Sequence, residues 1–284
     1  MKARNIICMA LTLLVSVTAM ARDSFRWRVN AAKSDPQKVC TIELQNPEAF
    51  DQISLNVAGD LEYTQSTNGT SGVTLIVSEN VIDKIEAFVA HGRLSIECKR
   101  GLKNVSISNA QIRVIAHSPS LSVVKLNASG DVTLKESIRT EELTLHVNGS
   151  GDINAHDLTC RSANVSINGS GDINVRDLTC QSTNIDINGS GDINMRNLNC
   201  QSANVVISGS GDVNLAGKAK EAYLEISGSG DIDCKRLLCQ QVRADINGSG
   251  DIDCYASETL TAHIDGSGEI DCSGSPQKSI YKKR

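Results

Sequence analysis

Residues 148–154 read Asn-Gly-Ser-Gly-Asp-Ile-Asn, and the chain repeats this stretch with small changes between residues 127 and 272. The acidic residue of the motif recurs at steps of 21, 20, 20, 20, 19, 20 and 18 residues. A unit of this length cannot bury its own apolar face and becomes stable only by stacking on copies of itself, so the period predicts a solenoid. The acidic positions are Asp131, Asp152, Asp172, Asp192, Asp212, Asp231, Asp251 and Glu269.

The stretches on either side of each motif alternate apolar and polar residues. Residues 164–168 read Asn-Val-Ser-Ile-Asn, which is the two-residue period of a strand with one face on a core. Gly-Ser-Gly supplies a sharp corner, where a side chain would obstruct the backbone. β-branched inward residues and glycine pairs every 20 residues exclude leucine-rich and ankyrin-type units. We predict an all-β, right-handed parallel β-helix of about seven rungs, with about 20 residues per rung, capped by an irregular N-terminal β region.

Equivalent positions of successive units form columns of one chemical kind. The polar columns before and after the glycines are rich in asparagine, whose amides can bond to their copies one rung above and below. The seven cysteines of the repeats stand where other units have small or apolar residues, so we expect buried free thiols. The sequence leaves a disulfide between Cys40 and Cys98 as an alternative, because both side chains have inward parity and exported proteins commonly form disulfides. The inward columns are Ala155, Val175, Met195, Leu215, Cys234, Cys254 and Cys272, and Cys160, Cys180, Cys200 and Cys239.

Four segments follow from these patterns. Residues 1–21 have the basic start, apolar run and small-residue cleavage site of a signal peptide. Residues 22–126 form an N-terminal β region or cap, 127–272 the β-helix repeats, and 273–284 a basic C-terminal tail. Residues 57–61 and 127–132 look like degraded copies of the motif, so the solenoid would begin before its clean repeats. No stretch after the leader is long and apolar enough for a transmembrane helix.

Charge is distributed unevenly along the chain. Without the leader, 26 Lys and Arg stand against 33 Asp and Glu, and residues 127–272 alone hold 22 acidic and 10 basic residues, a net charge of −12. Nucleic-acid binding is disfavoured because it requires a basic face. The basic tail either folds over the last rung, its lysines meeting Asp253 and Asp271, or leaves an edge at which two copies meet as a homodimer.

A resemblance to a known family becomes specific in the first half of the chain. Residues 50–53, 58–61, 79–83, 92–96 and 112–126, followed by the Gly-Ser-Gly-Asp array, closely resemble the bacterial "putative autotransporter adhesin, head GIN domain" family. The resemblance covers about residues 48–272. It implies an exported all-β protein of Gram-negative bacteria with an adhesin-like role, and it implies no enzymatic activity and no catalytic residues.

Two other functions stay open. A carbohydrate-active β-helix enzyme would mount paired carboxylates in a cleft whose acids do not repeat, yet aromatic residues, on which sugars stack, are only 3% of the chain. A calcium-stabilised module would place Ca²⁺ between the C-terminal rungs, because hard cations prefer oxygen ligands. In the competing interpretation, each repeated Asp accepts hydrogen bonds from glycine N–H groups at the corner. The calcium candidates are Asp231, Asp233, Asp251, Asp253, Glu269 and Asp271.

These observations favour a non-enzymatic protein that is exported to the periplasm, the cell surface or the medium. We predict an adhesin-like or envelope-scaffold protein that binds a protein or a glycan through a repetitive acidic surface. It would need no cofactor, apart from the calcium of the alternative hypothesis.

Overall fold

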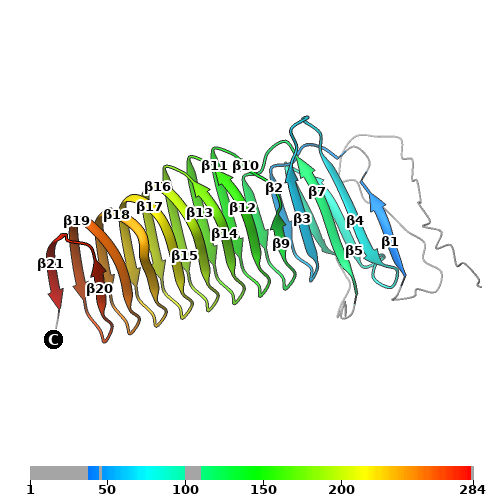
Figure 1. Ribbon diagram of the computed structural model, residues 1–284. Coiled ribbons are helices and arrows are strands. Elements are labelled where there is room, and N and C mark those ends of the chain that lie inside the picture. The colour runs from blue at the N-terminus through cyan, green and yellow to red at the C-terminus, as the bar shows by residue number, and fades with distance from the viewer. Residues whose placement is uncertain (1–37, 45–46, 100–109, 283–284) are drawn as a thin grey trace, which may run out of the picture.

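The computed structural model describes residues 38–44, 47–99 and 110–282, which form an elongated rod of stacked rungs (Figure 1). The rod is an all-β parallel solenoid of about eight turns with about 20 residues each. This confirms the predicted fold class, with about one turn more than expected. The predicted signal peptide, residues 1–21, lies outside the described residues.

Strand segments that follow the glycine motif form one long wall of the rod, here called the motif wall. It contains β9 (Val132–Leu134), β12 (Ile153–Thr159), β14 (Ile173–Thr179) and the first residues of β16 (Ile193–Ile207), all paired in parallel. The register places Ile153, Ile173 and Ile193 directly over one another. The short β10 (Ile138–Arg139) pairs with the later part of β12. The in-register stacking on which the sequence analysis rests is therefore confirmed.

Strand segments that precede the motif form the second wall, here called the opposite wall. It contains β8 (Val123–Leu126), β11 (Glu142–Val147), β13 (Ser162–Ile167) and β15 (Ser182–Ile187). From β16 onward one long strand serves both walls of the rod. These strands are β17 (Val213–Ile226), β18 (Ile232–Ile246) and β19 (Ile252–Ile264).

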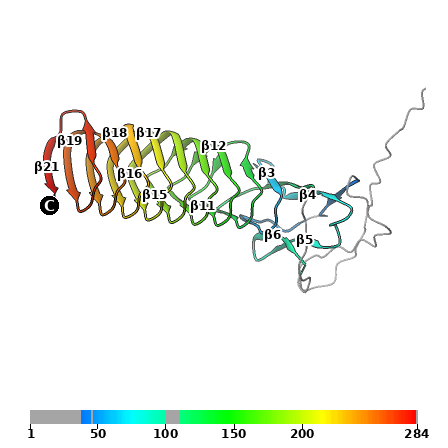
Figure 2. The ribbon, with the colours of Figure 1, turned by 90° about the horizontal axis from the view of Figure 1, so that it is seen from below.

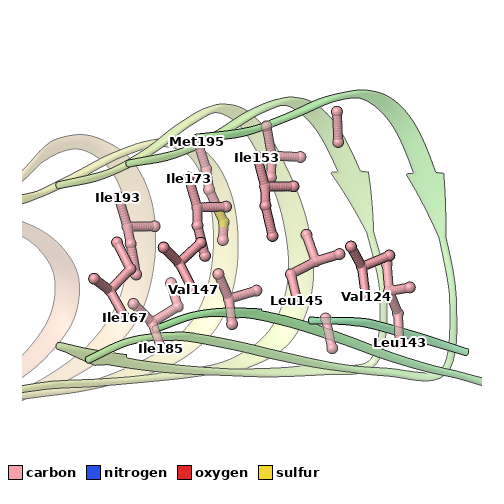
Figure 3. Close-up of a cluster of buried hydrophobic side chains, with 14 of the residues drawn as sticks. Val124, Leu143, Leu145, Val147, Ile153, Ile167, Ile173, Ile185, Ile193 and Met195 are labelled. Atoms are coloured by element: carbon pink, nitrogen blue, oxygen red, sulfur yellow. The ribbon is translucent and has the colours of Figure 1, made fainter. Parts of the chain in front are cut away.

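Apolar side chains from the two walls meet inside the rod. In Figure 3, Ile153, Ile173 and Ile193 point from one wall toward Val147 and Ile167 of the other, and these five side chains are fully buried. The buried cysteines of the repeats are all free thiols, as expected. Cys40 and Cys98 are also free, so the disulfide left open by the sequence is absent.

The first rungs are not stacked in sequence order. β2 (Gln52–Leu55) and β3 (Asp60–Gln65) pair with β8 and β9, which confirms that residues 57–61 are an early copy of the corner. Their other edges pair with β6 (Arg93–Cys98) and β7 (Ile112–Ser118), which come later in the chain. The solenoid thus begins before residue 127.

Antiparallel strands cover this N-terminal end. β4 (Gly72–Ser78) pairs with β7 and carries β1 (Val39–Glu43) on its far edge, while β5 (Ile85–Ala90) pairs with β6. Figure 2 shows β4, β5 and β6 at one end of the stack and β21 at the other. This layer is the predicted irregular cap.

The C-terminal segment continues the solenoid. β20 (Ile270–Ser273) and β21 (Gln277–Lys282) both pair in parallel with β19, one on each wall. The basic tail thus covers the edge of β19 on one wall as a further strand. The expected contacts of its lysines with Asp253 and Asp271 stay a prediction.

Candidate binding surface

The Gly-Ser-Gly corners of successive rungs lie in close contact. A Cβ atom on Gly169 would lie 1.9 Å from the carbonyl oxygen of Gly149, and one on Gly171 would lie 2.0 Å from that of Gly151. None of these glycines has a positive φ. Glycine is needed here because the neighbouring rung occupies the space of a side chain, and the corner therefore stacks at a fixed distance.

The acidic column beside the corner is a ladder of inter-rung hydrogen bonds. The backbone N–H of Asp172 donates to Oδ1 of Asp152 at 2.8 Å, and the N–H of Asp192 donates to Asp172 at 2.8 Å. The pattern runs from Asp60 to Glu269, whose N–H donates to Asp251 at 2.7 Å. The expectation that glycine N–H groups are the donors is wrong: each donor is the N–H of the next acidic residue. One oxygen of each carboxylate from Asp60 to Asp251 is thus committed to holding the rungs together.

Asparagine columns run parallel to the acidic ladder. The amide nitrogen of Asn168 donates to Oδ1 of Asn148 at 3.2 Å, and that of Asn188 donates to Asn168 at 3.3 Å. A second column joins Asn194 to Asn174 at 3.2 Å in the same way. The predicted amide ladders are confirmed. Much of the outer surface near the corners therefore bonds to itself.

The six calcium candidates belong to two different columns. Asp231, Asp251 and Glu269 end the acidic ladder. The other three pair in register on the motif wall and continue a column that begins with asparagine; they are Asp233, Asp253 and Asp271.

A lysine lies among the second group of acids. Nζ of Lys235 lies 2.8 Å from a carboxylate oxygen of Asp253, and its backbone N–H donates to Asp233. The hydrogen bond to Asp253 raises the pKa of Lys235, and the charges of Asp271 and Asp233 act in the same direction. Within residues 38–44, 47–99 and 110–282, no three His, Cys, Asp or Glu residues are grouped so as to hold a metal ion. Lys235 thus offsets part of the negative charge of this cluster.

Near the C-terminal end of the opposite wall, an outer column that carries asparagine in three successive rungs changes its chemistry. It lies beside a column whose residue already varies from rung to rung, as in His146, Ser166 and Asp186. The first column runs Asn184, Asn204, Tyr223, Arg243 and Thr261 in register. The neighbouring one runs Asp186, Val206, Glu225, Asp245 and His263. The later residues of both columns line a hollow of about 390 Å³, here called the Tyr223 hollow. The sequence analysis does not predict this hollow, although the change from asparagine to Tyr223 and Arg243 in the first column could have revealed it.

The side chains of the Tyr223 hollow hold one another in place. The hydroxyl of Tyr223 donates to Glu225 at 2.7 Å, and Nε of Arg243 donates to Asp245 at 2.9 Å. The guanidinium carbon of Arg243 lies 5.6 Å from the centre of the Tyr223 ring, within cation–π range. The hydrogen bond to Glu225, with burial and the charges of both acids, raises the pKa of Tyr223 to about 12. Asp245 is buried, whereas the side chain of Arg243 is 63% exposed.

A second hollow, of about 700 Å³, lies where β3 ends. There the side-chain amide of Gln65 both accepts from the backbone N–H of Arg139 (2.7 Å) and donates to its carbonyl (3.0 Å), replacing a missing strand. Lys135 is paired with Glu62, and Arg176 is paired with two aspartates, so most of the charge near this hollow is neutralised internally.

The geometry defines a class of protein: a rigid parallel β-solenoid with a self-bonded outer surface and one irregular polar hollow on the opposite wall. The chain belongs to the family described as "Putative auto-transporter adhesin, head GIN domain", whose model matches residues 49–215 and 174–276. No curated protein matches the chain. In its described part, no helix is long and apolar enough to cross a membrane.

Solved structures of several bacterial proteins share the fold. Two are described as putative adhesins, from Parabacteroides distasonis (20% identity, TM-score 0.66) and Parabacteroides merdae (20%, 0.64). A third is described as a putative lipid binding protein from Parabacteroides distasonis (23%, 0.65). Each match covers 87% of this chain and 94% of the other. At these identities the likeness shows the fold alone.

Proposed function

We propose that this adhesin-like protein acts without catalysis, as a rigid exported module that binds a protein or glycan at the cell envelope. Its family is named for adhesins, which supports an exported or surface location. The observation that carries the proposal is the self-bonding of the outer columns. The Asp and Asn side chains of these columns form hydrogen bonds between rungs. They therefore stiffen the rod, which favours a rigid binding surface over a mobile catalytic one.

The net charge of the repeats indicates which kinds of partner are favoured. Residues 127–272 carry a net charge of −12, which disfavours nucleic acid and favours basic or neutral partners. If a basic protein binds the surface that carries the acidic ladder, its affinity for the rod will fall as the salt concentration rises. Exposed charges are screened over about 8 Å at physiological ionic strength. A neutral glycan will show little salt dependence.

The proposal can be tested with the chain from residue 22 onward, labelled at its N-terminus. It would be applied to an array of purified glycans and envelope or matrix proteins at two salt concentrations. We expect saturable binding to at least one class. Absence of binding to every probe would contradict the proposed function.

The Tyr223 hollow supports a second candidate function, that of a carbohydrate-active enzyme. Its acids do not repeat in every rung, which is the feature expected of a carbohydrate-active enzyme, and Glu225 and Asp245 pair in register. Paired carboxylates are the usual catalytic groups of glycoside hydrolysis. Incubation with purified polysaccharides and measurement of new reducing ends would separate the two: turnover that is lost in Glu225→Gln would establish the enzyme.

A further inference from the structure

We propose that the Tyr223 hollow is a binding site for a neutral saccharide. The inference rests on the proposed binding function and names the chemistry of one ligand. Its first support is the local break in the repeat. Elsewhere in the same column Asn184 donates to Asn164 at 3.0 Å, a bond that stabilises stacking. In later rungs of this column Tyr223 and Arg243 take the place of asparagine.

The second support is the free hydrogen-bonding capacity around the hollow. Arg243 is fixed by Asp245 through Nε, while its two terminal nitrogens bond to no described residue. The side chains of Asn247 and His263 likewise make no hydrogen bond within the described part of the chain. Glu225 accepts from Tyr223 and, at 3.5 Å, from Ser227, and Asp245 accepts from Arg243. Each carboxylate oxygen can accept a second hydrogen bond, and the two side chains lie on neighbouring rungs about 4.8 Å apart along the stack. Donors and acceptors thus line one small space, as the hydroxyl groups of a ligand require.

The third support is the balance of charge and apolar surface. Two carboxylates stand against one guanidinium, so a phosphate or another anion would be repelled. The ring of Tyr223 adds an apolar patch, and aromatic rings are suited to contact the C–H face of a sugar. A volume of about 390 Å³ lies in the range of small-ligand sites. A neutral saccharide satisfies all of these features together.

The test uses the chain from residue 22 onward and a panel of purified neutral tetrasaccharides built from mannose, galactose or N-acetylglucosamine. Tyr223→Asn places in the hollow the residue that the same column has at Asn204, so the variant is expected to fold. Asp245→Asn removes the anchor of Arg243. Asp186→Asn is the matched control, because Asp186 lies in the same column as Asp245 but outside the hollow.

We expect calorimetry to detect binding of at least one tetrasaccharide, at least tenfold weaker in Tyr223→Asn and Asp245→Asn and unchanged in Asp186→Asn. Circular dichroism melts would confirm that all three variants fold. Equal binding by wild type and Tyr223→Asn would overturn the site, as would binding of oligolysine but of no saccharide. If wild type and Tyr223→Asn both bind the array partner and bind the tetrasaccharides equally or not at all, the proposed function stands and only this inference fails.

Discussion

The substitution Gly169→Ala tests whether the corner glycines are required by the neighbouring rung. The added Cβ would lie 1.9 Å from the carbonyl oxygen of Gly149, whereas real Cβ atoms essentially never come within 3.0 Å. The rungs must therefore separate locally by more than 1 Å. That movement strains the bond from the N–H of Ser170 to Gly149 (3.0 Å) and the one from Ser190 to Gly169 (2.9 Å).

The cost can be bounded from these contacts. Overpacking costs about 1–3 kcal/mol, and two weakened hydrogen bonds add about 1 kcal/mol. We expect a loss of about 2–4 kcal/mol in the free energy of unfolding, which lowers Tm by about 5–15 °C in a chain of this size. Urea denaturation and thermal melts followed by circular dichroism would measure it. Because solenoids can lose cooperativity, the number of transitions must be compared as well.

Two control substitutions separate the possible reasons for a glycine. Ser170→Ala changes an exposed side chain in the same corner and should stay within about 0.5 kcal/mol of wild type. Gly69 has a φ of +76° but open space around it, so Gly69→Ala should cost only the backbone strain, about 1–2 kcal/mol. A loss in Gly169→Ala no larger than in Ser170→Ala would refute the steric argument.

Four further outcomes can be checked. Asp192→Ala should cost about 1 kcal/mol in urea melts, because the N–H of Asp212 loses its acceptor, whereas Asp192→Asn keeps an acceptor and should be nearly neutral. Burial raises the pKa of Cys239 to about 12; above the ordinary value of 9.0 the unfolded thiol ionises while the folded one stays protonated, so stability should fall between about pH 9 and 12. That fall should be shallower in Cys239→Ala. EDTA should leave Tm unchanged, because Lys235 already pairs with an acid of the candidate calcium cluster; a lower Tm that Ca²⁺ restores would revive the calcium hypothesis. Sedimentation equilibrium should show a homodimer if the outer edges of β20 and β21 pair between copies, and a monomer at all concentrations would exclude it.

The repeating part of the fold was predictable because each column carries its own evidence. Ile153, Ile173 and Ile193 share one parity and one spacing, so their stacking could be read without coordinates. The N-terminal rungs lack that redundancy. Nothing in the letters of residues 93–98 indicates that they pair with residues 52–55, because a single long-range contact leaves no period. The exchange of rung order is therefore a tertiary result.

The Tyr223 hollow was not predictable from the repeat, because its residues depart from the repeated pattern. The residues of regular columns maintain the stack. They are the least available for a ligand, because side chains such as Asp172 and Asn168 already bond to neighbouring rungs. Residues free to bind are those at which a column changes its chemistry without loss of the strand. Tyr223 and Arg243 meet that condition, because their strands stay in register while their side chains replace the asparagines of the same column. In a solenoid of this kind, interruption of an outer column is thus a better indicator of a binding site than the column itself.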